Sequence, residues 1–351
     1  MLLLHRALAR PSFALIFLAG LLFVQPPSAE ARSPLDLVLP TENTKIFSDP
    51  PSYYMYVNRS FEGQSSRPWQ GGQYGFIRNP KRTSAGLLYT KFHEGMDVKP
   101  VRRSPDGTPL DEVFAVAAGR VVHVNDSSSA SNYGKYIVIE HNWGDGPFYS
   151  LYAHLMSSSV QPGQTVSPGT PIGRLGYTGV GLDKTRAHLH FELNMMLHRG
   201  FERWHDKSFS SPNHHRIFNG LNLTGIDVAD LYKAHAENKK LSLPDFIQNT
   251  EPYFTVLTPK GPSLDLLTLY PWLGKKISRS DPSWEITFSA SGIPLKIESS
   301  SKTVSAPVVT WVKKSPTYHS YYTNGRLSGA GENATLSNSG KSYLRLITGQ
   351  F

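Results

Sequence analysis

Two histidines at alternate positions, His188 and His190, are the first residues whose types and spacing could support catalysis. They begin an apolar run with the composition of a β-strand, and alternate residues of a strand project from the same face. Both imidazoles can therefore point toward one place. Taken alone, the pair is better explained as two ordinary polar-face side chains, so a functional role needs support from other residues.

A histidine and an aspartate four residues apart, His93 and Asp97, form a second group, and His154 closes another apolar run. A spacing of four would suit a helix, but Gly95 and Pro100 disfavour one. We expect an extended, turned segment that can present His93 and Asp97 together. Each group by itself is also compatible with a surface loop or a structural histidine.

The conjunction of these groups indicates zinc chemistry. A zinc ion that activates water has about four ligands, one of which is solvent. Two imidazoles and one carboxylate would leave a net charge of about +1 on the site, which keeps the metal a strong Lewis acid. Two further histidines would then remain to handle protons. The chain has no cysteine, so any metal site must use histidines and carboxylates.

Charge and length restrict the classes of partner. The chain has 351 residues, enough for two domains, and a net charge of +9. A basic surface favours polyanions, but the basic residues are scattered and form no patch interleaved with aromatic residues. Nucleic-acid binding is therefore disfavoured, and for an exported protein the expected polyanions are cell-wall polymers or anionic lipid. The absence of cysteine also excludes structural disulfides.

The N-terminus predicts export. Arg6 and Arg10 precede an apolar run over residues 13–24, and an Ala-Glu-Ala cleavage site follows at 29–31. We therefore assign residues 1–31 to a signal peptide that is cleaved after Ala31. An uncleaved membrane anchor is the alternative, although the run has only about a dozen residues. The expected location is the periplasm or cell envelope, with an extracellular location also open.

Short apolar runs separated by turn residues predict a mainly β, antiparallel fold. The expected strands of the central region are rich in Val, Ile, Phe and Tyr and cover residues 113–124, 135–140, 148–153 and 188–196. Glycine and proline clusters separate them, and no alternation of strands with helices suggests a parallel sheet.

The expected organisation has five parts. Residues 1–31 are the signal peptide, 32–72 an irregular N-terminal segment, 73–235 the catalytic domain with an insertion at 198–221, 236–259 a helical, proline-containing linker and 260–351 a smaller β-rich domain. Within these parts we expect a helix over 228–238, strands at 284–288 and 307–312, and long loops over 323–342.

Ordered motifs carry a resemblance to a known family. They are Tyr-Gly-Phe-Ile-Arg at 74–78, His-Glu-Gly-Met-Asp-Val at 93–98, Gly-Thr-Pro at 107–109, Val-Ala-Ala-Gly-Arg-Val at 116–121, Leu-Tyr-Ala-His-Leu at 151–155, Val-Ser-Pro-Gly-Thr-Pro-Ile-Gly at 166–173, Gly-Tyr-Thr-Gly at 176–179 and His-Leu-His-Phe-Glu at 188–192. In this order they resemble the lysostaphin-type, or LytM-like, zinc peptidoglycan endopeptidases. The resemblance covers residues 73–196.

The resemblance implies roles for five residues. His93, Asp97 and His190 would bind Zn²⁺, and His154 and His188 would form the catalytic pair. It also implies an antiparallel β domain with a groove, and the peptide cross-links of bacterial peptidoglycan as substrate. Which of the two catalytic histidines is the general base stays open. So does the bond cut, either a D-alanyl–diaminopimelate link or a glycine bridge.

The chain departs from the family's pattern in its loops. Residues 99–106, 180–187 and the insertion at 198–221 are longer than usual, and such loops would flank a groove and affect substrate choice. Glu94 and Glu192 could orient a ligand imidazole, with solvated carboxylates as the equal alternative. Asn79 is a weak candidate for an occluding ligand. His123 and His141 are interpreted as structural.

Two other functions remain open. Domains of this kind that lose ligands can become non-catalytic modules that bind cell wall and activate another hydrolase, but here all five expected residues are present. The same chemistry could also cut Gly-rich secreted proteins. The C-terminal domain carries no catalytic motif, so we expect it to bind cell wall or to restrain access to the groove. The oligomeric state and any inhibition by the N-terminal segment stay open.

Overall fold

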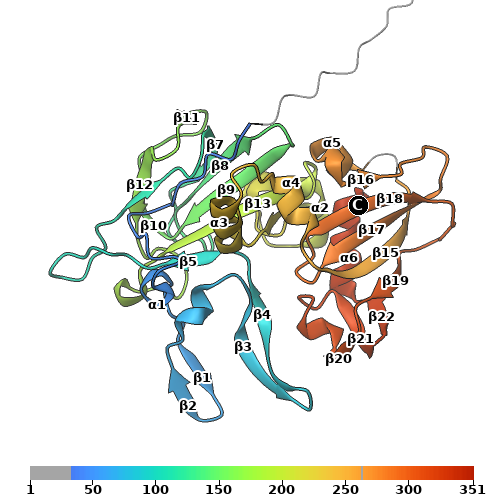
Figure 1. Ribbon diagram of the computed structural model, residues 1–351, viewed down its shortest axis with the longest axis horizontal. Helices are drawn as coiled ribbons and strands as arrows, with labels where there is room; N and C mark the ends of the chain where they lie inside the picture. Colours follow the sequence, from blue (N-terminus) through green and yellow to red (C-terminus); the bar gives the residue numbers. More distant parts are fainter. Residues whose placement is uncertain (1–32, 262–263) are drawn as a thin grey trace, which may run out of the picture. The chain divides into compact units, whose positions relative to one another are not determined.

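An antiparallel seven-stranded sheet positions the candidate residues (Figure 1). The computed structural model describes residues 33–261 and 264–351. Six strands follow one another across the sheet as β11 (Thr165–Val166), β7 (Gly119–Asn125), β8 (Tyr136–Asn142), β9 (Pro147–Ala153), β13 (Leu189–Met196) and β14 (Leu223–Gly225), and β5 (Met96–Val98) also pairs with β13. The expected mainly β, antiparallel fold is confirmed.

Strand β13 is buried along its whole length. Its apolar side chains, such as Phe191 and Leu193, are in the hydrophobic core, as expected for a strand covered on both faces. Its alternate polar residues His190, Glu192 and Asn194 are buried as well. Buried polar side chains need hydrogen-bond partners, so this face of β13 is a candidate for function rather than for packing.

Smaller sheets surround this core. One has the order β10 (Leu155–Ser158), β12 (Pro171–Leu175), β6 (Glu112–Phe114), and two hairpins consist of β1 (Arg59–Phe61) with β2 (Gln64–Ser66) and β3 (Gly75–Thr83) with β4 (Gly86–His93). The N-terminal segment also has α1 (Pro50–Tyr53) and the 3₁₀ turn η1 (Trp69–Gly72), so it is less irregular than expected. The expected strand 113–124 is two strands, β6 and β7, separated by a turn.

Helices occupy the segment after β13. They are α2 (Phe201–Ser208), η3 (Arg216–Phe218), α3 (Val228–Glu237) and α4 (Leu243–Gln248), with η2 (Lys184–Arg186) lying before β13. The helix expected over 228–238 is confirmed as α3, whose first turn is capped by the Asp227 side chain. The insertion at 198–221 contains α2, which the sequence did not predict.

The C-terminal region has a five-stranded sheet in the order β16 (Gly274–Lys275), β18 (Pro294–Ser300), β17 (Ser283–Ser289), β15 (Pro252–Pro259), β19 (Val308–Val312). A three-stranded sheet follows, β20 (Ser315–Tyr318), β21 (Leu327–Gly331) and β22 (Asn333–Leu336). The remaining elements are α5 (Asp265–Leu269), η4 (Pro271–Leu273), η5 (His319–Tyr321) and α6 (Asn338–Thr348). The prediction of long loops over 323–342 is wrong, because β21, β22 and the start of α6 lie there.

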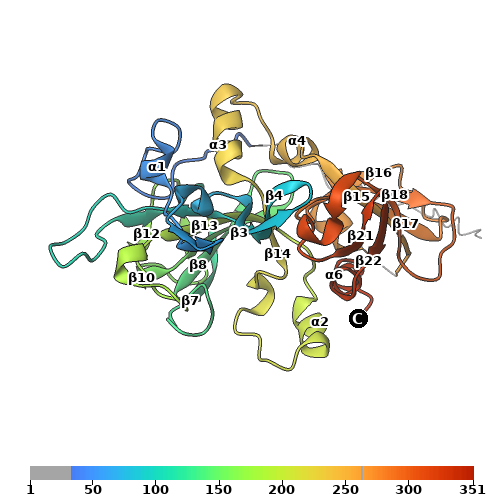
Figure 2. The same ribbon diagram turned by 90° about the horizontal axis from the view of Figure 1, so that it is seen from below.

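The described residues form one compact unit. Tyr270, in the C-terminal region, contacts the seven-stranded sheet. The Tyr270 hydroxyl donates to the Pro147 carbonyl at 2.7 Å and accepts from the Met196 amide at 2.8 Å. Helices α2 and α6 lie side by side (Figure 2), and the Trp204 indole donates to the Ser342 carbonyl. Among the described residues, no helix has the length and apolar character that a membrane span requires. The expected signal peptide, residues 1–31, lies outside the described residues.

Candidate active site

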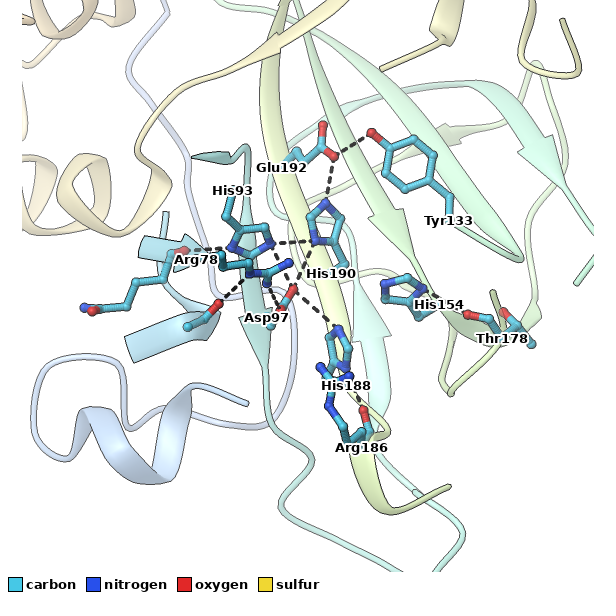
Figure 3. A network of polar contacts seen from close by, with 12 residues as sticks. Arg78, His93, Asp97, Tyr133, His154, Thr178, Arg186, His188, His190 and Glu192 are labelled. Carbon is cyan, nitrogen blue, oxygen red and sulfur yellow. Dashed lines mark hydrogen bonds and ion pairs between the residues drawn. The ribbon is translucent and has the colours of Figure 1, made fainter. Parts of the chain in front are cut away.

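Three side chains from different strands converge at one point (Figure 3). His93 ends β4, Asp97 lies in β5 and His190 lies in β13. His93 Nε2 is 3.1 Å from both Asp97 Oδ1 and His190 Nδ1, and His190 Nδ1 is 3.0 Å from Asp97 Oδ1. All three side chains are buried. The structure thus brings together the three residues that the sequence proposed as metal ligands.

Local backbone geometry explains this convergence. Asp97 and His190 are direct partners in the antiparallel pairing of β5 with β13. Gly95 lies in the turn between His93 and Asp97, where a Cβ atom would be 2.4 Å from the Phe191 carbonyl oxygen. Only glycine lets this turn approach β13 so closely. The segment is extended and turned, as the sequence predicted.

The hydrogen bonds of the two histidines fix which nitrogen is free. His93 Nδ1 is 2.7 Å from the Gln73 carbonyl oxygen, and His190 Nε2 is 2.7 Å from Glu192 Oε1. Both acceptors lack a proton to give, so these nitrogens donate in the neutral imidazoles. The lone pairs then lie on His93 Nε2 and His190 Nδ1, the two atoms that face Asp97.

Glu192 belongs to a buried polar network behind His190. It accepts hydrogen bonds from the Tyr133 hydroxyl at 2.9 Å and from Asn194 Nδ2 at 2.9 Å, besides the contact with His190. A carboxylate that holds a ligand imidazole in one orientation is a regular feature of metal sites. Burial excludes solvation as the explanation for Glu192, and its contact with His190 is compatible with the orienting role.

His154 and His188 lie next to the three converging side chains. Their rings are 4.8 Å apart in an edge-to-face arrangement, and His188 Nε2 is 3.4 Å from Asp97 Oδ1. His154 Nδ1 is 2.9 Å from the Thr178 carbonyl oxygen, and His188 Nδ1 is 2.6 Å from the Arg186 carbonyl oxygen. In both neutral rings Nδ1 is therefore the donor and Nε2 carries the lone pair.

His154 has an unusual backbone conformation. Its φ of 63° is in the left-handed region, which costs a non-glycine residue roughly 1 kcal/mol or more. It stands between β9 and β10, and its amide donates to the Tyr133 carbonyl at 2.9 Å. The turn directs the ring toward the His188 ring, and strained conformations of this kind gather at functional sites.

Arg78 is a residue of the site that sequence reasoning missed. Its Nη2 donates to Asp97 Oδ2 at 2.5 Å, and its Nε donates to the Gly71 carbonyl at 2.8 Å. Asp97 Oδ1 is thereby left to face the histidines. Asn79 is exposed, so the hypothesis that it acts as an occluding ligand is not supported. The arginine of the Tyr-Gly-Phe-Ile-Arg motif was the available signal.

Burial and neighbouring charges shift the pKa values of Asp97 and His154. Burial would raise the pKa of Asp97, but the neighbouring His93, His188 and Arg78 hold it well below its usual range. Burial, together with the nearby His188 and His190, holds the pKa of His154 well below its usual value. His154 is thus a neutral imidazole, able to accept a proton.

His190 behaves differently without a metal. Burial would lower its pKa, but hydrogen bonds with Asp97 and Glu192 raise that pKa to about 10. A metal ligand has to be deprotonated, so a cation at this point would displace a proton from His190.

The donor atoms fit a small tetrahedral cation. Zinc bonds to nitrogen and oxygen are roughly 2.0–2.2 Å long, so two ligand atoms of one tetrahedral site lie about 3.4 Å apart. The observed separations of 3.0–3.1 Å require only small outward shifts. His93, Asp97 and His190 could therefore hold a metal ion, with two nitrogens and one carboxylate oxygen as donors.

Known proteins are similar to the part of the chain that contains this site. Residues 91–200 match the family described as Peptidase family M23. A protein of Haemophilus influenzae described as an uncharacterized metalloprotease is 32% identical over 117 residues, which cover 33% of this chain and 22% of that protein. The peptidoglycan DD-endopeptidase ShyA of Vibrio cholerae is 34% identical over 115 residues, which cover 33% of this chain and 23% of ShyA.

Two solved structures are also similar. The catalytic domain of the antimicrobial peptidase lysostaphin from Staphylococcus simulans is 25% identical, with 39% of this chain and 79% of that chain covered and a TM-score of 0.25. A zinc-containing peptidase from Vibrio cholerae is 26% identical, and the match covers 40% of this chain and 36% of that chain with a TM-score of 0.25. The match spans less than a quarter of the length of the two curated relatives. Residues 91–200, the part of the chain that matches the model of Peptidase family M23, include all five side chains of the candidate site.

Proposed function

We propose that this protein is an exported zinc metallo-endopeptidase that hydrolyses the peptide cross-links of bacterial peptidoglycan. The observation that carries the proposal is the convergence of His93, Asp97 and His190 on one point, with His154 and His188 beside them. In all four histidines a hydrogen bond holds one ring nitrogen and leaves the other for chemistry.

His93, Asp97 and His190 would hold the metal ion through Nε2, Oδ1 and Nδ1. A bound zinc ion would lower the pKa of a coordinated water from 15.7 to roughly 7 and polarise the scissile carbonyl. Arg78 and Glu192 keep the Asp97 carboxylate and the His190 ring in place. The ligand assignment explains why these polar side chains are buried together.

His154 and His188 would handle the protons. Their Nδ1 atoms donate to backbone carbonyls, which leaves Nε2 for proton transfer, and a neutral imidazole can accept the proton of the attacking water, a step worth about 10²–10⁴ in rate. The second imidazole can donate a hydrogen bond to the developing oxyanion or protonate the leaving amine. Because the two rings touch, either assignment is geometrically open.

The substrate is proposed from chemistry and from relatives. ShyA, a relative over part of this chain, is a peptidoglycan DD-endopeptidase. The net charge of +9 and the apparent export signal suit an anionic polymer outside the cytoplasm. A D-alanyl–diaminopimelate link is the preferred bond.

The test is digestion of purified peptidoglycan by the full chain, followed by measurement of released muropeptides and new amino groups. Wild type should release both, chelation should stop the reaction, and zinc should restore it. His154→Ala and His188→Ala should lower turnover by about 10²–10⁴. His214→Ala, a substitution of an exposed histidine, is the matched control and should be fully active.

Two outcomes would contradict the proposal. One is full activity of zinc-free His190→Ala protein. The other is an inactive zinc-loaded wild type that stimulates a separate amidase, which would make this chain a non-catalytic activating module. Parallel digestion of a Gly-rich protein would reveal a protease of broader specificity.

A further inference from the structure

A pocket of about 550 Å³ lies beside the candidate site and takes no part in the chemistry proposed above. It is enclosed by the end of β4, by the insertion that carries α2, and by the C-terminal region. Representative lining residues from these three parts are Phe92, Glu94, Trp204, Phe209, Arg326 and Tyr343. Helices α2 and α6, which contribute to two of its sides, are neighbours in Figure 2.

One wall of the pocket adjoins the metal centre. Glu94 directly follows His93, and its carboxylate lies within 4.8 Å of ligand atoms of His190 and Glu192. A peptide that reaches the converging histidines could therefore extend into this space. Phe92 and Glu94 are the chain neighbours of His93, so the pocket lies next to the site, and most of its lining comes from segments outside the family match.

The C-terminal part of the lining presents a cation without an acidic partner. Arg326 lies with its guanidinium 4.1 Å from the centre of the Tyr343 ring, and burial lowers its pKa. Within residues 33–261 and 264–351, no carboxylate forms an ion pair with it. A partly desolvated cation without a counter-charge is costly, and an anionic ligand would remove that cost.

Arg326 is also fixed in position. Nη1 donates to the Ser291 carbonyl at 2.7 Å, its only side-chain hydrogen bond to the described residues. A Cβ atom at Gly292 would be 2.9 Å from the guanidinium carbon, so the backbone at Gly292 passes close to this end of the arginine. A guanidinium has five N–H donors, and most of these remain available to a ligand that binds in the pocket.

Apart from Glu94, which adds a carboxylate at the β4 end of the pocket, the lining suits a carboxylate on an organic chain better than an inorganic anion. Ser339, Ser342 and Asn324 add hydroxyl and amide groups near the cation, while Trp204 and Phe92 add aromatic surface. Mixed polar and aromatic walls bind a group with both a charge and apolar atoms. A peptide end with a free carboxylate has this chemistry.

We propose that this pocket is a subsite that binds a free carboxylate of the peptide substrate through Arg326. The inference rests on the proposed function, since it names the part of the substrate that the C-terminal region recognises. It also gives the insertion at 198–221 and the C-terminal region a shared role in substrate selection.

The test measures binding rather than turnover. The full-length chain is titrated by calorimetry with a D-alanine-terminated stem peptide, and separately with the same peptide after amidation of its carboxylates. Arg326→Gln should weaken binding of the free acid about tenfold, as loss of a charge-assisted hydrogen bond predicts, and leave the amide unchanged. Arg345→Gln removes an exposed positive charge from the same region and should change neither affinity.

A second variant protects the test against misfolding. Asn324→Asp keeps Arg326 and adds a negative charge to the lining, so it should also weaken binding of the free acid selectively. Thermal unfolding and zinc content establish that each variant is folded. If both folded variants keep the wild-type preference for acid over amide, or if inorganic phosphate competes as well as the peptide, the proposal is overturned. Selective binding without hydrolysis would instead contradict the proposed function and leave the subsite standing.

Discussion

At the scale of single residues, the site depends on partners that fix the ring nitrogens. Three of the four histidines donate to backbone carbonyls, those of Gln73, Thr178 and Arg186. The fourth, His190, donates to Glu192. Each partner selects one tautomer in the neutral ring and so fixes which nitrogen of that ring is left for a ligand.

The substitution Glu192→Gln tests this arrangement. The glutamine side chain would retain the shape of the glutamate but lose the charge that orients His190, so zinc affinity should fall about 10–100-fold. Competition with a chromophoric chelator measures the affinity. Glu237→Gln, at an exposed carboxylate, is the control. Equal affinities for Glu192→Gln and wild type would show that the carboxylate has no such role.

The five proposed site residues could be identified from the sequence because each lies in a recognisable motif. The acceptors could not be identified, because a backbone carbonyl at Gln73 or Thr178 has no sequence signature and is placed only by the fold. Arg78 lies between these cases. It lies in the motif at residues 74–78, but its contact with Asp97 joins β3 to β5 and can be recognised only in the tertiary structure.

At the scale of elements, the turn between β4 and β5 sets the position of two site residues at once. Gly95 allows this turn to lie against β13. An alanine would place a methyl group against the Phe191 carbonyl and push His93 and Asp97 away from His190.

The substitution Gly95→Ala should therefore lower the free energy of unfolding by about 1–3 kcal/mol, the usual cost of overpacking. It should also weaken zinc binding, because the donor atoms move apart. Urea unfolding of the metal-free protein and chelator competition measure the two effects separately. An unchanged unfolding curve together with unchanged zinc affinity would mean that the close approach does not matter.

Sequence patterns predicted some elements better than others. The strands β8, β9 and β13 are rich in Val, Ile, Leu, Phe, Tyr and Met, and most of their residues are buried, which is the pattern that the sequence displays. The segment 323–342 has little such pattern. There, α6 forms because Ser337 caps its first turn and residues such as Leu344 and Ile347 pack into the core, a tertiary effect that local composition does not display.

At the scale of the whole molecule, stability should depend on buried histidines away from the site. His141 is fully buried, between the Ala118 carbonyl and the Ser150 hydroxyl. Burial lowers its pKa from 6.5 to about 4, with the Ala118 hydrogen bond opposing this shift. The unfolded chain therefore binds a proton in the range in which the folded chain does not.

The direction in which stability changes with pH follows from this difference in proton binding. The contribution of His141 to stability is fully present above pH 6.5 and is lost as the pH falls from 6.5 toward about 4. Between about pH 7.5 and 5 the loss should be about 2 kcal/mol. Urea unfolding of wild type and His141→Gln at both pH values tests this. The variant should lose less stability than wild type on acidification, whereas His214→Gln should behave as wild type does; parallel losses in all three would refute the assignment.

The most direct test of the metal centre is the zinc content of purified, zinc-loaded protein after removal of free metal, measured by mass spectrometry. One zinc per chain is predicted for wild type, His154→Ala and His188→Ala. His93→Ala, Asp97→Ala and His190→Ala should lose most of it while remaining folded by circular dichroism. A folded His190→Ala protein that retains a full equivalent of zinc, or a wild type that binds none, would contradict the proposed centre.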